Sequence, residues 1–436
     1  MSTLRRTLGV TDLTLLVIGN VIGSGIFLVP STVLKQSGSV SVALLVWLVG
    51  GVLSLFGALA YGELGAMDQS SGGLYAFIRD AFGRFPAFLY GWTLFFVIGA
   101  GTIATLAVAA ANYMGQFADL TPRMKQVVAV ALIAIMTVIN VRGTRQSASV
   151  QNWATGIKVG AILVMSVILL SMGGANRSSE APLVVGTSVS MLSAVGTAMI
   201  SVLWAYEGWQ YVTFAAGEAV DPQRSLPRAI TIGTAALIAI YLLANVAYLA
   251  ALGPERVAAS ERVAGEAVAA VLGSWAGSAI AIAIIISMYS AAHATVITAP
   301  RVYFTMARDR VFFSKLAEVH PKFGTPAFAV VTSCIWSAVL AWSGTFEQLL
   351  TYVVFVGWIF YALGAASVIV LRRKRPDVPR PFRVPGYPLT PILFVLAAIA
   401  IVGNTIVTQP TQAAIGLGVV FLGAPAYWLW TRGQRT

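Results

Sequence analysis

Long apolar segments joined by short connections are the feature that most limits what this chain can fold into. A helix that crosses the hydrocarbon core of a bilayer needs about 20 mostly apolar residues. Twelve segments of the sequence have this character, namely residues 11–32, 41–66, 85–112, 124–141, 153–172, 189–217, 229–252, 276–304, 326–343, 347–371, 390–408 and 412–431. The sequence therefore predicts an all-α integral membrane protein with twelve transmembrane helices.

The composition excludes several other classes of protein. Hydrophobic residues make up 58% of the chain and charged residues 10%, whereas a soluble domain has about a quarter charged residues. The basic residues fall in short turns and form no patch with interleaved aromatic residues, so we expect no nucleic-acid partner. Two histidines and one cysteine supply no cluster of catalytic groups or metal ligands. We therefore expect no enzyme, no metal site and no cofactor.

The distribution of lysine and arginine predicts the orientation of the chain. Cytoplasmic loops of membrane proteins carry an excess of these residues. An even number of spans puts both termini on one side, and that side collects 22 of the 28 basic residues. We expect a multi-pass protein of the cell membrane with both termini in the cytoplasm. Two amphipathic stretches, residues 69–84 and 254–274, are expected to lie at the membrane interface.

Two of the predicted spans are interrupted by residues that do not suit a lipid-facing helix. The first contains Gly19, Gly23 and Gly25, and glycine costs about 1 kcal/mol relative to alanine within a helix. The sixth carries the carboxylate of Glu207 in mid-span, followed by Gly208. Glycine clusters alone more often serve close helix packing. Irregular backbone together with an ionisable group at membrane depth instead indicates a functional site.

The two interrupted spans occupy corresponding positions if the first ten helices form two halves of five. An odd number of helices per half gives the halves opposite orientations, which predicts a five-plus-five inverted repeat with two additional helices. Residues 1–436 then form a single transmembrane transporter domain. Within it, residues 11–172 form the first repeat, residues 189–371 the second, and residues 390–431 the additional helices. This arrangement is typical of secondary transporters that bind substrate between broken helices.

The residue types at the two interruptions suit an α-amino acid. The freed amides of Gly23, Ser24 and Gly25 are expected near the N-terminus of a half-helix, which favours a carboxylate. Unwound carbonyls near Ala205 are expected to accept hydrogen bonds from an ammonium group. A carboxylate and an ammonium held a few ångströms apart describe an amino acid substrate.

Motifs along the whole chain carry a family resemblance. They include Gly23-Ser24-Gly25-Ile26-Phe27, Tyr61-Gly62-Glu63-Leu64-Gly65, Ala81-Phe82-Gly83, the segment from Trp204 to Trp209, Met306-Ala307-Arg308-Asp309 and Pro379-Arg380-Pro381-Phe382. In this order they resemble the amino acid–polyamine–organocation (APC) superfamily, and within it the L-type amino acid transporters and the bacterial serine/threonine exchangers. The resemblance implies the LeuT-like fold. It implies a substrate site formed by Val21, Ile22, Gly23, Ser24, Gly25, Ile26, Trp204, Ala205, Glu207 and Gly208.

Two further polar residues in the apolar spans are candidates for a role in transport. Lys158 begins the fifth span, and from its position alone its side chain would extend to the membrane surface. The resemblance implies instead that Lys158 reaches the first and eighth helices, where sodium-coupled relatives bind an ion. A fixed ammonium at that place implies sodium independence. His293 in the eighth span is either a hydrogen-bonding residue between helices or a carrier of protons.

The expected function is a sodium-independent amino acid transporter that works by alternating access and exchanges neutral L-amino acids. Two alternatives on the same fold stay open. One is a proton-coupled permease that uses Lys158, Glu207 or His293. The other is a broad-range or cationic amino acid permease, in which Glu207 neutralises a basic side chain. The external loop at residues 116–125 contains no cysteine, so we expect no disulfide-linked accessory subunit and only the substrate and the lipid bilayer as partners.

Overall fold

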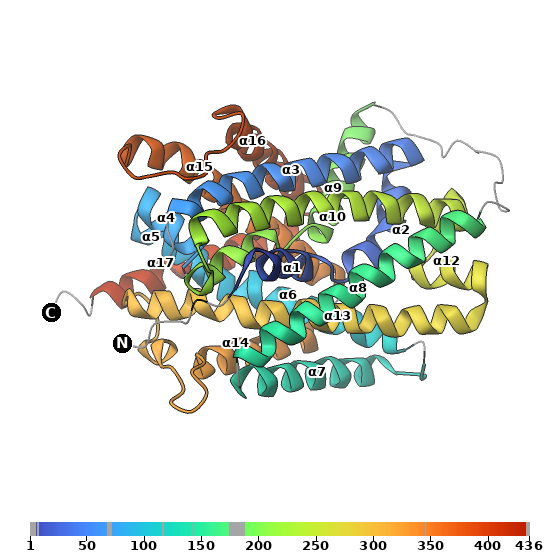
Figure 1. Ribbon diagram of the computed structural model, residues 1–436, viewed down its shortest axis with the longest axis horizontal. Helices are drawn as coiled ribbons and strands as arrows, with labels where there is room; N and C mark the ends of the chain where they lie inside the picture. Colours follow the sequence, from blue (N-terminus) through green and yellow to red (C-terminus); the bar gives the residue numbers. More distant parts are fainter. Residues whose placement is uncertain are drawn as a thin grey trace.

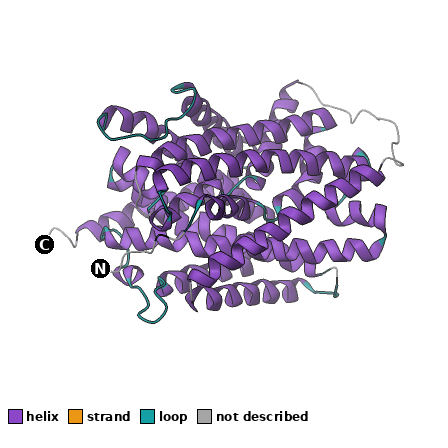
Figure 2. Ribbon diagram, in the orientation of Figure 1, coloured by secondary structure: helices purple, strands orange, loops and turns teal. Residues whose placement is uncertain are grey.

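Helices that run side by side form nearly the whole molecule (Figures 1 and 2). The computed structural model describes residues 6, 8–67, 72–115, 117–142, 144–173, 188–344 and 346–432. Within these ranges the β pairing is a single isolated bridge between Leu8 and Ala219. The all-α class predicted from the apolar segments is therefore confirmed for the described residues.

The helices follow one another with short connections, as the sequence predicts. In chain order they are α1 (Val10–Val21), α2 (Gly25–Ser37), α3 (Val40–Met67), α4 (Leu74–Phe82), α5 (Arg84–Thr93), the π-helical η1 (Leu94–Ile98), α6 (Gly99–Met114), α7 (Pro122–Arg142), α8 (Thr144–Met172), α9 (Ser188–Ala205), the 3-10 helix η3 (Trp209–Glu218), α10 (Pro222–Leu252), α11 (Pro254–Ala259), α12 (Val263–Leu272), α13 (Ser274–Arg308), the 3-10 helix η4 (Ser314–Ala317), α14 (Ala327–Ser343), α15 (Phe346–Lys374), α16 (Leu389–Thr408) and α17 (Pro410–Arg432).

Most of the predicted spans correspond to long apolar helices. Nine helices of the described chain are long and apolar enough to cross a membrane, and the bent pair of α1 and α2 makes ten when counted as one span. Two predicted spans differ. Residues 189–217 divide between α9 and η3, and residues 326–343 form α14, which has only 17 residues.

Both interruptions that the sequence predicts are present. The chain bends by 47° between the end of α1 at Val21 and the start of α2 at Gly25. It leaves the α-helical path again between α9 and η3, where Gly208 has a φ of +126°. A Cβ on Gly25 would lie 2.4 Å from the Cα of Ala205, so glycine allows the two interruptions to touch.

The second part of the stretch predicted at residues 69–84 packs against the rest of the protein, and its position at the membrane interface stays a prediction. Residues 69–71 are outside the described residues, and α4, which follows, has a buried apolar face that includes Leu74 and Ile78. Its polar groups find partners in the protein: the Tyr75 hydroxyl and the Arg79 guanidinium both donate to Asp309, at 2.9 Å and 2.8 Å. These partners allow an amphipathic helix to pack inside the bundle. The second stretch, residues 254–274, forms α11 and α12.

Ion pairs connect the helices at the end of the bundle where both ends of the chain lie (Figure 1). Glu63 at the end of α3 is fully buried and accepts hydrogen bonds from Arg372 at 2.8 Å and 2.6 Å. The backbone amide of Val384 donates to the same carboxylate at 2.7 Å, and Arg380 Nε lies 3.5 Å from it. Glu63 therefore fixes the segment between α15 and α16 against α3.

Replacing Glu63 with alanine is expected to destabilise the protein strongly. Removing one member of a buried ion pair leaves its partner charge uncompensated and costs about 3–5 kcal/mol. Arg224 is a matched control, because it pairs with Asp221 at 3.9 Å while its side chain is 74% exposed, and such pairs contribute about 0–1 kcal/mol. Unfolding curves of the detergent-purified variants measure both. Equal losses in Glu63→Ala and Arg224→Ala would contradict this role of Glu63.

Candidate functional site

A small cavity lies where the two interruptions meet. Its volume is about 20 Å³, which is room for about one water molecule. It is lined by Asn20, Val21, Gly23, Ser24, Gly25, Thr102, Leu106, Trp204, Glu207 and Tyr211. One site is therefore formed by residues of α1, α2, α6 and η3 together with the end of α9.

Most residues that the sequence analysis selected at the interruptions lie around this cavity. Val21, Gly23, Ser24, Gly25, Trp204 and Glu207 line it. The other four, Ile22, Ile26, Ala205 and Gly208, do not line it but are adjacent in the chain to residues that do. Gly208 packs against α1, since a Cβ there would lie 2.9 Å from the backbone of Asn20.

Four lining residues were not among those selected from the sequence. Asn20 and Tyr211 lie close to the interruptions in the sequence. Asn20 could have been identified from the sequence, because it is a polar residue directly after Gly19. Thr102 and Leu106 come from α6, within an apolar span that shows no interruption in the sequence. Only the packing of α6 against the other helices reveals them.

The ammonium of Lys158 holds the interruption of α1. Lys158 extends from α8, is 4% exposed and donates to the carbonyls of Gly19 at 2.7 Å and Ile22 at 2.8 Å. The Ser287 hydroxyl of α13 donates to the same Ile22 carbonyl at 3.2 Å. Carbonyls at a helix end have no partner within the helix, so these donors satisfy groups that the interruption frees. The side chain does not extend to the membrane surface.

The hydroxyl of Tyr241 connects the two interruptions. It lies 3.2 Å from the carbonyl of Val21 and 2.9 Å from the carbonyl of Ala205. Tyr241 belongs to α10 and is fully buried. The Ala205 carbonyl, which the sequence analysis proposed as an acceptor for an ammonium group, therefore already has a donor from the protein.

Glu207 is buried and hydrogen-bonded on the protein side. Its Oε1 accepts from Gln210 Nε2 at 2.5 Å and from the Tyr361 hydroxyl of α15. Gln210 Nε2 also lies 2.8 Å from the Tyr361 oxygen. The carboxylate of Glu207 thus lines the cavity while two neutral donors fix its position.

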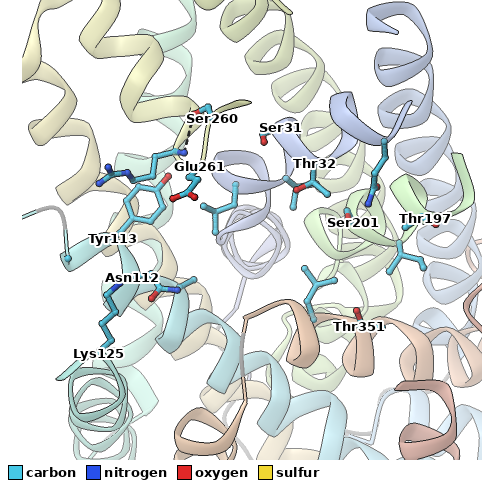
Figure 3. Close-up of a pocket in the computed structure, with 18 of the residues that line it drawn as sticks. Ser31, Thr32, Asn112, Tyr113, Lys125, Thr197, Ser201, Ser260, Glu261 and Thr351 are labelled. Carbon is cyan, nitrogen blue, oxygen red and sulfur yellow. Dashed lines mark hydrogen bonds between the residues drawn. The ribbon is translucent and has the colours of Figure 1, made fainter. Parts of the chain in front are cut away.

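Trp204 lines the small cavity, and a much larger cavity lies close by. The Trp204 indole donates to the Ser24 hydroxyl at 3.2 Å, which connects α9 with the start of α2. The larger cavity has a volume of about 750 Å³ and begins about one turn further along both helices, at Ser201 and Leu28. Figure 3 shows its polar wall, which includes Ser31, Thr32, Asn112, Tyr113, Lys125, Thr197, Ser201, Ser260, Glu261 and Thr351.

The opposite side of the site is held by contacts at the end of η3. Glu218 pairs with Arg301 of α13 at 2.6 Å, and both side chains are largely buried. The amide of Leu8 donates to the Glu218 carbonyl at 3.0 Å, and the amide of Val220 donates to the Leu8 carbonyl at 2.8 Å. The segment before α1 and the end of η3 are therefore joined, and both are tied to α13.

His293 lies on α13 and does not line the small cavity. It is 4% exposed, and its ring stacks on Tyr289 at 6.3 Å between centroids. Among the described residues, no group of three or more His, Cys, Asp or Glu side chains is placed to hold a metal ion.

Comparisons with known proteins agree with this site. The sequence profile of the amino acid permease family matches residues 8–426. The chain is 32% identical to the large neutral amino acids transporter small subunit 2 of Rattus norvegicus, covering 98% of this chain and 81% of that protein. It is 30% identical to the serine/threonine exchanger SteT of Bacillus subtilis (strain 168), over 98% of this chain and 97% of that protein.

A third relative has a different named substrate. The human cystine/glutamate transporter is 31% identical over 96% of this chain and 85% of its own length. The family profile and the relatives describe permeases, transporters and exchangers, which agrees with the long apolar helices and the cavities between them. The chain therefore belongs to the amino acid permease family of the APC superfamily and is a multi-pass membrane transporter, not an enzyme.

Proposed function

We propose that the protein is a sodium-independent exchanger of neutral L-amino acids that works by alternating access. The observation that carries this proposal is the position of the Lys158 ammonium, at 2.7 Å and 2.8 Å from two carbonyls that the interruption of α1 exposes. A cation bound at such carbonyls would stabilise the same backbone. A covalently attached ammonium does so without taking an ion from solution.

The substrate carboxylate is proposed to bind at the start of α2. The first amides of an α-helix have no partner within the helix, and the helix dipole favours negative charge there. Gly23, Ser24 and Gly25 line the small cavity at this position. The names of two relatives support the substrate class, since one refers to large neutral amino acids and the other to serine and threonine.

We propose that the chain crosses the membrane twelve times. The first ten helices form a five-plus-five inverted repeat, two helices follow it, and residues 1–436 form one domain. The mutual contact of the two interruptions, at Gly25 and Ala205, supports this division. We propose that the end of the bundle where α4 and the C-terminal ends of α13 and α15 lie faces the cytoplasm, because these segments carry arginines such as Arg79, Arg308 and Arg372. The larger cavity then faces the outside.

We also propose that the transporter works without a disulfide-linked subunit. The chain has one cysteine, Cys334, which lies within α14 and is 2% exposed. A thiol in the interior of a helix bundle is not accessible to a partner protein.

Replacing Lys158 with alanine is expected to lower uptake at least tenfold while leaving the amount of folded protein unchanged. The variant leaves the Gly19 and Ile22 carbonyls without their charged donor, and hydrogen bonds from charged groups contribute about 1.5–3 kcal/mol. Uptake of labelled amino acid into proteoliposomes measures the loss. Lys35→Ala, an exposed lysine of α2, is the control and should transport normally. Normal uptake by Lys158→Ala would exclude the proposed role.

Exchange and sodium independence predict a defined response in liposomes. Labelled alanine or serine is expected to enter only vesicles that contain an internal amino acid, because an exchanger completes its cycle only with substrate bound in both directions. Uptake is expected to be equal with sodium or choline as the external cation. A pH gradient alone should drive none. Uptake into empty vesicles on a pH gradient would instead establish proton coupling.

Replacing Glu207 with glutamine distinguishes neutral from cationic substrates. The carboxylate already accepts hydrogen bonds from Gln210 and Tyr361, so we expect no role in recognising a basic side chain. Glu207→Gln is therefore expected to lower uptake of alanine, serine and arginine by the same factor. Competition of each amino acid against one labelled substrate measures these factors. A loss confined to arginine would favour the cationic alternative.

A further inference from the structure

Four basic side chains at one end of the bundle have no acidic partner. Residues 79–84 and 372–383 together carry eight basic residues and two acids. Four of the eight form ion pairs with the carboxylates of Glu63, Asp80 and Asp309. The other four are exposed and form no ion pair within the part of the chain that the structure describes, namely Arg84, Arg373, Lys374 and Arg383.

Two of these cations come together at the junction of α4 and α5. Lys374 is the last residue of α15, and Arg84 is the first residue of α5. The Lys374 ammonium donates to the carbonyl of Ala81 at 2.8 Å, three positions before Arg84. This hydrogen bond fixes the end of α15 beside the start of α5, so their positive charges belong to one surface.

The chain that follows α15 is held in one conformation. The Arg380 guanidinium donates to the carbonyls of Leu371 at 3.0 Å, Arg375 at 2.8 Å and Val378 at 2.9 Å. The last carbonyls of a helix have no partner within the helix, and basic side chains near a helix end can satisfy them. The backbone that carries the unpaired cations of this segment is therefore fixed by the protein itself.

Aromatic side chains next to Arg84 indicate the level of the membrane surface. Phe85 is exposed, and its ring centroid lies 5.2 Å from that of Tyr427 near the end of α17. Trp428, the next residue of α17, is 55% exposed. Tryptophan and tyrosine are enriched where a membrane span meets the lipid headgroups. Because α5 and the end of α17 lie together at one end of the bundle (Figure 1), Arg84 is at the depth of the lipid phosphates.

We propose that Arg84 and Lys374 bind the phosphate of an anionic phospholipid, with Arg373 and Arg383 adding to the positive charge of this surface. Guanidinium and ammonium groups are the common phosphate-binding groups of proteins, and clusters of them beside a membrane span attract anionic lipids. A zwitterionic headgroup is disfavoured, because its own cation offsets the attraction. Phe85 then contacts the lipid next to its headgroup. Binding of this lipid does not depend on which amino acid is transported.

Thermal unfolding of the detergent-purified protein tests the proposal, with dioleoylphosphatidylglycerol or dioleoylphosphatidylcholine added at the same mole fraction. A ligand that binds only the folded state stabilises it, so phosphatidylglycerol is expected to raise the unfolding midpoint by about 2–4 °C more than phosphatidylcholine does. The double variant Arg84→Gln/Lys374→Gln is expected to lose about half or more of this difference. Both side chains are exposed, so the variant should fold normally without lipid.

The double variant Arg224→Gln/Arg228→Gln is the matched control. It removes two exposed cations from the first turns of α10, so the net charge of the protein changes by the same amount. The control is expected to keep the full difference between the two lipids. Equal losses in the two double variants would reduce the effect to net charge and overturn the site.

Arg84→Gln alone covers the outcome in which the first double variant does not fold, because Lys374 then keeps its hydrogen bond to the Ala81 carbonyl. A partial loss of the difference between the lipids is expected. An equal rise with phosphatidylcholine, or with inorganic phosphate in place of any lipid, would overturn the proposal of an anionic lipid. An unchanged difference in either folded variant would overturn the assignment of these side chains.

Discussion

The need to satisfy backbone polar groups inside a membrane governs the centre of this structure. An interrupted helix at membrane depth exposes carbonyls that neither lipid nor the helix itself can pair. Lys158, Ser287 and Tyr241 supply the missing donors from three other helices, at 2.7–3.2 Å. Because the donors are side chains of α8, α13 and α10, the interruption of α1 depends on the tertiary packing around it.

The surroundings of the site differ on its two sides. On one side, Trp204 lines the small cavity, and a cavity of about 750 Å³ begins about one turn away at Ser201 and Leu28. On the other, Glu218, Arg301 and the segment at Leu8 join η3 to α13 and to the start of the chain. Buried and partly buried ion pairs need good geometry to offset the cost of removing charge from water. The two sides of the site therefore differ in chemistry, with an ion pair and backbone hydrogen bonds on one side and an aromatic ring on the other.

The sequence predicted the all-α class and both interruptions because glycine and a lone carboxylate are conspicuous in apolar spans. Hydropathy could not predict how α4 packs, since its polar residues find partners such as Asp309 that are more than 200 positions away in the chain. Thr102 and Leu106 could not be predicted as lining residues for a related reason. Nothing in an uninterrupted apolar span indicates which of its faces will meet a cavity.

Under the proposed function, Ser24 would connect substrate binding to the position of Trp204. Its hydroxyl accepts the hydrogen bond of the Trp204 indole at 3.2 Å, and its residue lines the cavity at the start of α2. A carboxylate at the amides of α2 would lie beside the same hydroxyl, so the group that holds Trp204 in place is also a neighbour of the ligand. At about 20 Å³ the cavity is too small for an amino acid until Trp204 or the helices around it move. If substrate binds as proposed, binding and the position of Trp204 are coupled, because both involve the Ser24 hydroxyl group.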